Sequence, residues 1–219
     1  MFTFDGLGAG QLIKKWAGAI GQDCVLCAAA SGREVVCAAC AARLPACRDD
    51  SCAGSVEVRA VFAYRFPVDR LIHRFKFAGD LAVGRWLGMR LADRMVDVPK
   101  PDLLVAPPLT TARLRQRGFN QALEVAKVVG RAHGIRVALE AMEKVRDTPP
   151  QPSLSANERR ARLHGAFACR GDVRGLTVVI VDDVVTTGGT VNAMADALRE
   201  AGASQVSAWS VARTPVPSG

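Results

Sequence analysis

The sequence lacks any apolar run that approaches the roughly 20 residues of a membrane-spanning helix. Its N-terminal stretch also lacks the continuous apolar core of a secretory signal, because Lys14 and Lys15 interrupt it. Histidine is scarce, and the residues His73, His133 and His164 do not have the spacing of a metal site. These absences argue against membrane insertion, secretion and a histidine-based metal centre, and we expect a cytoplasmic protein.

The chain instead has a globular composition with positive charge concentrated in its middle. Its 219 residues are 49% hydrophobic, which suffices for one α/β domain and a small additional module. Residues 56–170 contain 21 Lys or Arg and 11 Asp or Glu, whereas residues 1–55 contain five of each. The basic middle favours an anionic ligand, a nucleic acid, or both, and a merely soluble basic surface is the alternative.

Six of the seven cysteines lie near the N-terminus, between residues 24 and 52. Four of them form two C-x2-C pairs, Cys24 with Cys27 and Cys37 with Cys40. Two such pairs offer four thiolates to a structural zinc ion, whereas disulfides are disfavoured in a reducing compartment. Cys47 and Cys52 are either further metal ligands or the remnant of a third pair. We therefore predict a zinc-binding module over residues 1–55.

Strands and helices are predicted to alternate after residue 56. Apolar alternation and helical spacing predict, in order, a strand at 58–64, a helix opened by Pro67, a helix at about 81–96, a strand at 103–106 and a helix at about 119–132. Asn120 is the expected cap of the last helix. Aromatic and basic residues interleave over 64–77, which suits single-stranded nucleic acid, although core aromatics beside solvated cations are the alternative.

The segment 177–198 combines a buried strand, two carboxylates, a glycine-rich loop and a helix. Val178–Val181 predict a strand buried on both faces, and Asp182 and Asp183 follow it. The loop TTGGT, residues 186–190, then leads into the helix, whose N-terminus favours a phosphate. The carboxylates suit sugar hydroxyls or magnesium, so that a phosphorylated ribose fits both halves. An ordinary strand–turn–helix corner is the alternative.

A second basic loop follows the strand that ends at Pro107. Arg113, Arg115 and Arg117 occur within five residues, just before the predicted helix. Arginines beyond the carboxyl end of a parallel strand suit a pyrophosphate group, and a solvated charge run is the alternative.

Residues 141–165 contain three prolines, few large apolar side chains and several cations, among them Lys144 and Arg146. This composition predicts a mobile flap rather than core. Ala166 and Phe167 are expected to resume the sheet.

The stretch VVIVDDVVTTGGT resembles the phosphoribosyl-pyrophosphate (PRPP) signature of type I phosphoribosyltransferases. The whole chain resembles the ComF family of competence-associated proteins, through the paired cysteines and the segments LIHRFKFAGD, APPL, RLRQRGFNQA and TPPQPSLSANERRARLHGAF. The resemblance implies a Rossmann-like type I phosphoribosyltransferase fold with a mainly parallel sheet over residues 56–219. A small zinc-ribbon-like module, residues 1–55, would precede it.

The resemblance also implies roles for individual residues. Asp182 and Asp183 would accept hydrogen bonds from the ribose hydroxyls, with magnesium accompanying PRPP. The residues implied for the 5′-phosphate are Thr186, Thr187, Gly188, Gly189 and Thr190. The residues implied for the pyrophosphate, partly on a closing flap, are Arg113, Arg117, Lys144 and Arg146.

Three functions fit these expectations. In the first, the protein binds PRPP with magnesium and handles single-stranded DNA during natural transformation, with DNA-uptake or recombination proteins as partners. In the second, it transfers ribose phosphate to a nucleobase or an amine, although the sequence offers neither an obvious base-recognition hood nor a catalytic acid or base. In the third, it senses PRPP and regulates a partner.

Overall fold

The computed structural model describes residues 21–47, 50, 52–146 and 165–215. The chain divides into two compact units, residues 1–44 and 45–219. The functional boundary expected at residue 55 stays a prediction. Most of the expected flap, residues 147–164, lies outside the described residues. Over the described ranges, no helix is long and apolar enough to cross a membrane.

Short hydrogen-bonded turns build the described part of the first unit, residues 21–44. The Cys24 N–H donates to the Ala29 carbonyl oxygen at 2.8 Å, and a single helical turn, α2 (Ala38–Ala41), begins after Cys37. The buried apolar side chains of this segment are Cys24, Val35, Val36 and Leu44. So small a core leaves the cysteines as the main constraint on these turns.

The second unit is built on a six-stranded sheet with the order β1-β2-β8-β7-β3-β4. Its strands are β1 (Cys52–Ala53), β2 (Val56–Ala63), β3 (Leu103–Val105), β4 (Arg136–Ala138), β7 (Thr177–Val185) and β8 (Gln205–Arg213). The short β1 is antiparallel to β2, and every other neighbouring pair is parallel. The mainly parallel sheet expected from the sequence is therefore confirmed.

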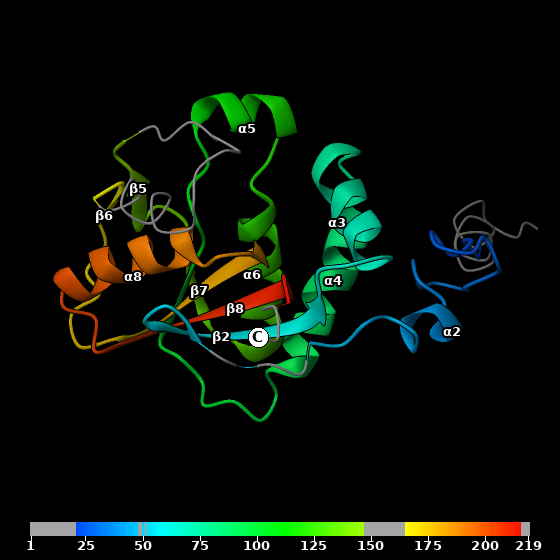
Figure 1. Cartoon of the computed structure of the whole chain (residues 1–219), viewed down its shortest axis with the longest axis horizontal. Helices are drawn as coiled ribbons and strands as arrows, with labels where there is room; N and C mark the ends of the chain where they lie inside the picture. Colours follow the sequence, from blue (N-terminus) through cyan, green and yellow to red (C-terminus); the bar gives the residue numbers. More distant parts are fainter. Residues whose placement is uncertain (1–20, 48–49, 51, 147–164, 216–219) are drawn as a thin grey trace, which may run out of the picture. The chain divides into compact units, whose positions relative to one another are not determined.

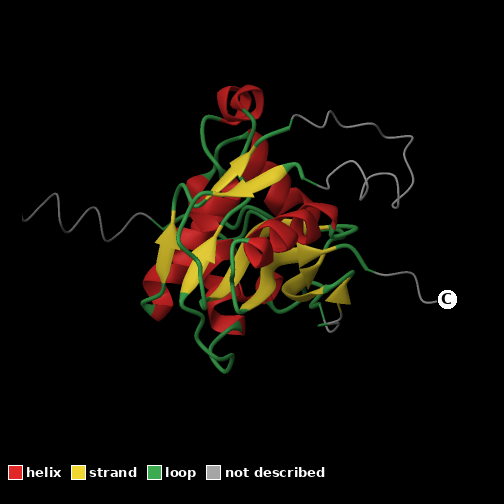
Figure 2. Cartoon of the chain, turned by 90° about the vertical axis from the view of Figure 1, so that its left-hand side faces the viewer, coloured by secondary structure: helices red, strands yellow, loops and turns green. Residues whose placement is uncertain are grey.

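Helices cover both sides of this sheet, as Figure 1 and Figure 2 show. The helices of the second unit are α3 (Val68–Phe77), α4 (Leu81–Arg94), α5 (Thr111–Arg117), α6 (Gln121–His133) and α8 (Gly189–Glu200). Helix α8 packs on β7 and β8 from one side, and α4 and α6 pack on the sheet from the other. The α/β class is confirmed, and the parallel strands carry their carboxyl ends to one common edge of the sheet.

That edge is held in place by a dry core. Strand residues such as Val178, Ile180 and Leu103 are fully buried and face Met194 and Leu198 of α8 within one apolar cluster. The β-branched run of β7 fits a strand covered on both faces. The loops that follow β2, β3 and β7 therefore rise from rigid supports.

Two expectations about β7 and the arginine loop are corrected. Strand β7 does not end at Val181 but continues through the acidic pair to Val185, because β8 pairs with it along this whole length. The arginines lie on a short helix, α5, rather than in a loop. Thr110 caps this helix by accepting a hydrogen bond from the Arg113 N–H. A threonine at this position is a sequence signal for the start of a helix, but the prediction relied on the arginines instead.

The expectation of a flap from residue 141 is also wrong at both of its ends. Strand β5 (Met142–Lys144) pairs antiparallel with β6 (Phe167–Cys169) in a separate two-stranded sheet. Phe167 therefore does not resume the main sheet. Met142 and Phe167 are both buried in the apolar cluster that includes α8, so the two-stranded sheet packs on the core.

Candidate ligand site and cysteine cluster

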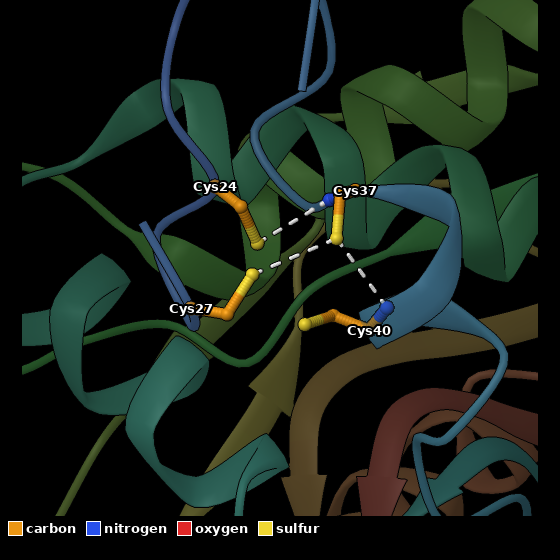
Figure 3. A group of neighbouring side chains, drawn as sticks. All are labelled: Cys24, Cys27, Cys37 and Cys40. Carbon is orange, nitrogen blue, oxygen red and sulfur yellow. Dashed lines mark hydrogen bonds between the residues drawn. The ribbon is translucent and has the colours of Figure 1, made fainter. Parts of the chain in front are cut away.

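The four cysteines of the C-x2-C pairs converge in the first unit (Figure 3). Their sulfur atoms lie within 4.8 Å of one another, and Cys27 Sγ and Cys37 Sγ are 3.8 Å apart. Tetrahedral zinc–thiolate bonds of about 2.3 Å place sulfur atoms about 3.8 Å apart. The Cys37 N–H and the Cys40 N–H each point at a cysteine sulfur, at 3.4 and 3.5 Å. This cluster can hold a metal ion such as zinc.

The electrostatics of the cluster also favour a cation. Burial raises the pKa of the Cys24 thiol, but backbone N–H groups, led by that of Cys37, outweigh it and lower the pKa to about 6. Hydrogen bonding with Cys27 and then Cys37 raises the pKa of Cys40 to about 12. Four thiolates cannot ionise together at neutral pH unless a cation neutralises them.

All seven cysteines lie in the described residues, and six of them, Cys24, Cys27, Cys37, Cys40, Cys52 and Cys169, form no disulfide there. Cys47 and Cys52 belong to the second compact unit. Their role as further metal ligands stays a prediction.

The acidic pair lies near the carboxyl end of β7. Asp183 is 8% exposed, and its backbone N–H donates to Asp182 Oδ1 at 2.8 Å. Burial raises the pKa of Asp182 to about 7, the negative charge of Asp183 adds to the rise, and the positive charge of Lys76 opposes it. Asp182 can therefore hold a proton near neutral pH.

Lys76 is the partner of this pair that the sequence did not assign to the site. Its Nζ lies 2.8 Å from Asp183 Oδ1, and both side chains are largely buried. Lys76 is the next-to-last residue of helix α3, so that a helix following β2 reaches across to β7. Its place among the cations and aromatics of residues 64–77 made it look like part of a solvated surface, and no local signal linked it to Asp183.

The glycine-rich loop joins β7 to α8. Thr186 and Thr187 are exposed, and Gly188 is the N-cap of α8 in the left-handed conformation, with φ of 76°. A Cβ at Gly188 would lie 2.5 Å from Ala53 Cβ, so only glycine fits there. Backbone N–H groups at the start of this 12-residue helix favour an anion beside the threonine hydroxyls.

A buried asparagine fixes the start of α8 to the turn between β1 and β2. Asn192 Oδ1 accepts from the Ser55 N–H at 2.9 Å, and Asn192 Nδ2 donates to the carbonyl oxygens of Ala53 and Gly188. This role could not be predicted from the sequence, because the three partners of Asn192 come together only in the folded sheet. Asn192 thus sets the conformation of the loop that precedes it.

The residues expected at the pyrophosphate lie in different surroundings. Arg113 is exposed on α5, which follows the carboxyl end of β3. Arg117 Nη1 donates to Gln121 Oε1 at 3.0 Å, and its guanidinium lies 5.4 Å from the centre of the Phe77 ring. Lys144 lies in β5, and Arg146 is exposed just before residues 147–164. A common pyrophosphate site for the four residues stays a prediction.

Comparisons with known proteins agree with this arrangement. The family described as "Phosphoribosyl transferase domain" matches residues 89–217. The chain is 36% identical over 161 residues to "DNA utilization protein YhgH" of Salmonella typhi, which covers 71% of each chain. It is 32% identical over 159 residues to "Competence protein F" of Haemophilus influenzae, covering 68% of this chain and 69% of the relative.

One solved structure with detectable similarity is the glutamine PRPP amidotransferase from B. subtilis complexed with ADP and GMP. It is 27% identical over 58% of this chain and 26% of that chain, with a TM-score of 0.41.

Proposed function

Because the chain belongs to the ComF family and carries its phosphoribosyl transferase domain, we propose that it binds PRPP with magnesium at the carboxyl edge of the sheet. The observation that carries the proposal is the joint between β7 and α8. There, an acidic pair near the end of β7 is followed by two exposed threonines, Thr186 and Thr187, and then by the glycine cap of helix α8. A ligand with sugar hydroxyls at one end and a phosphate at the other suits this joint.

Each part of the joint has a proposed share in binding. Asp182 and Asp183 accept hydrogen bonds from the two ribose hydroxyls, and Lys76 Nζ, 2.8 Å from Asp183 Oδ1, balances part of the negative charge of the pair. The oxygens of the 5′-phosphate accept hydrogen bonds from the backbone N–H groups and the hydroxyl groups of residues 186–190. Arg113, with Lys144 and Arg146, faces the pyrophosphate.

The carboxylate oxygens of this site are the ligand type that magnesium prefers. When bound with PRPP, magnesium would neutralise part of the charge on the pyrophosphate. The protein would contribute the orientation of the ribose and of both phosphate ends.

Binding is tested by titrating the protein with PRPP and magnesium chloride in a calorimeter. The double variant Asp182→Asn with Asp183→Asn keeps the size of both side chains and removes their charge, so we expect it to lose measurable binding. The matched control is Asp196→Asn, an exposed carboxylate on α8 whose loss should leave the affinity unchanged. Unaltered binding by the double variant would refute the assignment.

Transfer is proposed as the reaction that this site would support. The nitrogen of an acceptor would form a bond to C1 of the ribose as the bond from C1 to the pyrophosphate oxygen breaks. Pyrophosphate would leave with the bonding electrons, and the acceptor nitrogen would give up one proton to water. Release of pyrophosphate in the presence of nucleobases or amines would support an enzyme, and its absence across a broad panel would leave PRPP binding as a sensing function.

Binding of single-stranded DNA is the second candidate, and a basic cavity favours it. This cavity, of about 350 Å³, lies between the C-terminal end of α6 and the start of β4. Its cationic lining residues are Lys127, Arg131 and Arg136. Lys127 pairs with Glu124 at 2.7 Å, whereas Arg131 and Arg136 are exposed. The cavity lies at the amino end of β4, opposite the edge proposed for PRPP, so both ligands could bind together. The relatives named for DNA utilization and competence agree with such a function.

The DNA function is tested with a fluorescent oligothymidine at increasing salt. Each phosphate contact that is lost should lower the slope of log affinity against log salt by about 0.7 for a single strand. We expect Arg131→Glu with Arg136→Glu to weaken binding and reduce this slope. Arg70→Glu, an exposed arginine on α3, is the control for net charge. No affinity at low salt would remove this candidate.

The cysteine cluster is proposed to hold one structural zinc ion through Cys24, Cys27, Cys37 and Cys40. The sulfur geometry supports this assignment. We further propose residues 1–55 as the zinc-binding module and residues 56–219 as the phosphoribosyltransferase-like domain. A location in the cytoplasm would keep the thiols reduced and available to the metal.

A further inference from the structure

The cation that faces the acidic pair is part of the protein itself. Lys76 Nζ lies 2.8 Å from Asp183 Oδ1, and the two side chains are only 18% and 11% exposed. Lysine ammonium groups are strongly hydrated, and they are rarely placed in surroundings this dry unless they are paired. An ion pair of this kind adds little net stability, because the cost of removing both charges from water offsets their attraction. Stability alone therefore does not account for a lysine at this position.

The fold supports Lys76 in this position. The residue lies in the last turn of α3, where a positive charge is favourable at the end of a helix. The turn that follows is held by Arg74, whose Nε donates to Asp80 Oδ2 at 2.6 Å. Asp80 Oδ1 in turn caps α4 by accepting a hydrogen bond from the Val83 N–H at 3.2 Å. The ammonium group therefore reaches the acidic pair from a supported helix end.

The charge of the site depends on this lysine. Two ionised carboxylates alone would have two negative charges, an arrangement that attracts a divalent cation. With the ammonium group beside them, Asp182 and Asp183 keep at most one net negative charge. Charges interact strongly at short range in a poorly solvated site, so the ammonium group opposes the approach of a further cation to the same oxygens. A polyanion such as PRPP can still bring a divalent cation with it, because their complex remains anionic.

We infer that Lys76 is a specificity-determining residue of the acidic pair, which takes the place of a metal ion beside Asp183 and prevents a bare divalent cation from binding there. Divalent metal then enters the site only as a complex with a polyanionic ligand. The inference rests on the proposed binding of PRPP with magnesium, and it adds the reason why the site does not fill with metal alone. The selection is made by a residue of α3, outside the strand and the loop that are proposed to bind the ligand.

The test measures binding of manganese chloride to the full-length protein, with zinc supplied to the cysteine cluster and without PRPP. Mn²⁺ prefers the same oxygen ligands as Mg²⁺, and the free ion gives a paramagnetic resonance signal that decreases on binding. The titration is made at about pH 8, because the pKa of Asp182 is raised to about 7 and its proton would compete with the metal. Lys76→Met removes the charge but keeps a long side chain, so it should bind Mn²⁺ at least about 10-fold more tightly than the wild type. Lys76→Gln, a second neutral variant, should show the same gain.

Three further variants show whether the charge of Lys76 is responsible. Lys76→Arg keeps the positive charge and should bind Mn²⁺ as weakly as the wild type does. Lys100→Met removes the charge of an exposed lysine before β3, so it controls for net charge and should also match the wild type. In a variant that combines Lys76→Met with Asp182→Asn and Asp183→Asn, the tighter Mn²⁺ site should be lost. This loss would place the new site at the acidic pair.

Several results would overturn the inference. They are Mn²⁺ binding that is no tighter in Lys76→Met than in the wild type, an equal gain in Lys76→Arg or Lys100→Met, and a gain that survives removal of both carboxylates. Titration with PRPP and magnesium chloride separates this inference from the proposed function. If the wild type binds PRPP but the neutral variants gain no Mn²⁺ site, the inference alone fails. If the wild type does not bind PRPP, the proposed function fails and the inference fails with it.

Discussion

The cysteine cluster and the carboxyl-edge site differ in how their residues come together. The N–H to sulfur contact between Cys37 and Cys24 joins residues 13 positions apart. The contact between Ser55 and Asn192 joins residues 137 positions apart. The cluster is thus a local structure that its own spacing specifies, whereas the edge site exists only when the sheet has formed.

The two regions also differ in what stabilises them. The described first unit buries Cys24, Val35, Val36 and Leu44, too little apolar surface to hold its turns without further support. The second unit has a core of sheet and helix residues that is independent of any ligand. We therefore expect metal to decide the folding of the first region, and packing to decide that of the second.

The largest effect should follow from removal of the metal. Zinc binding to small modules contributes about 10–16 kcal/mol of apparent free energy near pH 7, and most of their folding depends on it. A chelator, or Cys24→Ser with Cys37→Ser, should abolish the metal content measured by elemental analysis. Amide hydrogen exchange should then show loss of protection over residues 21–44 and retained protection in β7 and β8.

The control for this experiment is Cys169→Ser, whose thiol donates to the Gly171 carbonyl oxygen in the second unit. Serine can keep that hydrogen bond, so metal content and protection should stay as in the wild type. Protection of residues 21–44 that survives metal loss would contradict the comparison.

A smaller effect, confined to the edge site, is expected from Gly188→Ala. The left-handed conformation at φ 76° costs a non-glycine residue about 1–2 kcal/mol, and overpacking against Ala53 adds about 1–3 kcal/mol. Urea unfolding should show a loss of about 2–5 kcal/mol, and PRPP binding should be lost because the loop must shift.

Gly175→Ala separates strain from overpacking. Gly175 has a φ of 71°, but a Cβ there would meet nothing within 4 Å. It should cost only about 1–2 kcal/mol and leave PRPP binding intact. Equal losses in the two variants would show that the contact between Gly188 and Ala53 has no importance.

How far the sequence predicts each region follows from the same contrast. The C-x2-C spacing was enough to predict the metal cluster, and the run from Val178 to Thr190 was enough to predict strand, loop and helix. The sequence did not predict the contacts of Lys76 with Asp183 or of Asn192 with Ser55, because these partners are distant in sequence. The hairpin of β5 and β6 was missed for a related reason. Each strand is only three residues long, and the pairing of Met142 with Cys169 joins residues on either side of the undescribed segment 147–164.

The acidic pair should make stability depend on pH. The pKa of Asp182 is raised from 3.8 to about 7, mainly by burial. Between these values the folded state holds a proton that the unfolded chain has released, so the free energy of unfolding should fall as pH rises through this window. We expect a loss of about 2 kcal/mol between pH 5 and pH 7. Asp182→Asn cannot titrate, and urea unfolding of this variant should lack that loss. A wild type with the same pH dependence as the variant would contradict the raised pKa.

The smallest effect, and the sharpest test of long-range assembly, concerns Asn192. Asn192→Ala removes the acceptor of the Ser55 N–H and the donor to Ala53 and Gly188, which should cost about 1–2 kcal/mol. The matched variant Asn192→Asp keeps the acceptor and loses only the donor. Amide exchange at Ser55 should therefore become fast in Asn192→Ala and stay slow in Asn192→Asp. PRPP affinity should fall in both, because the Gly188 carbonyl oxygen loses the side-chain donor and keeps only the Asn192 backbone N–H. If exchange at Ser55 stays slow in Asn192→Ala, the sheet and the contacts of Arg199 with Ser55 suffice to hold the turn. Asn192 would then not be needed to assemble the edge site.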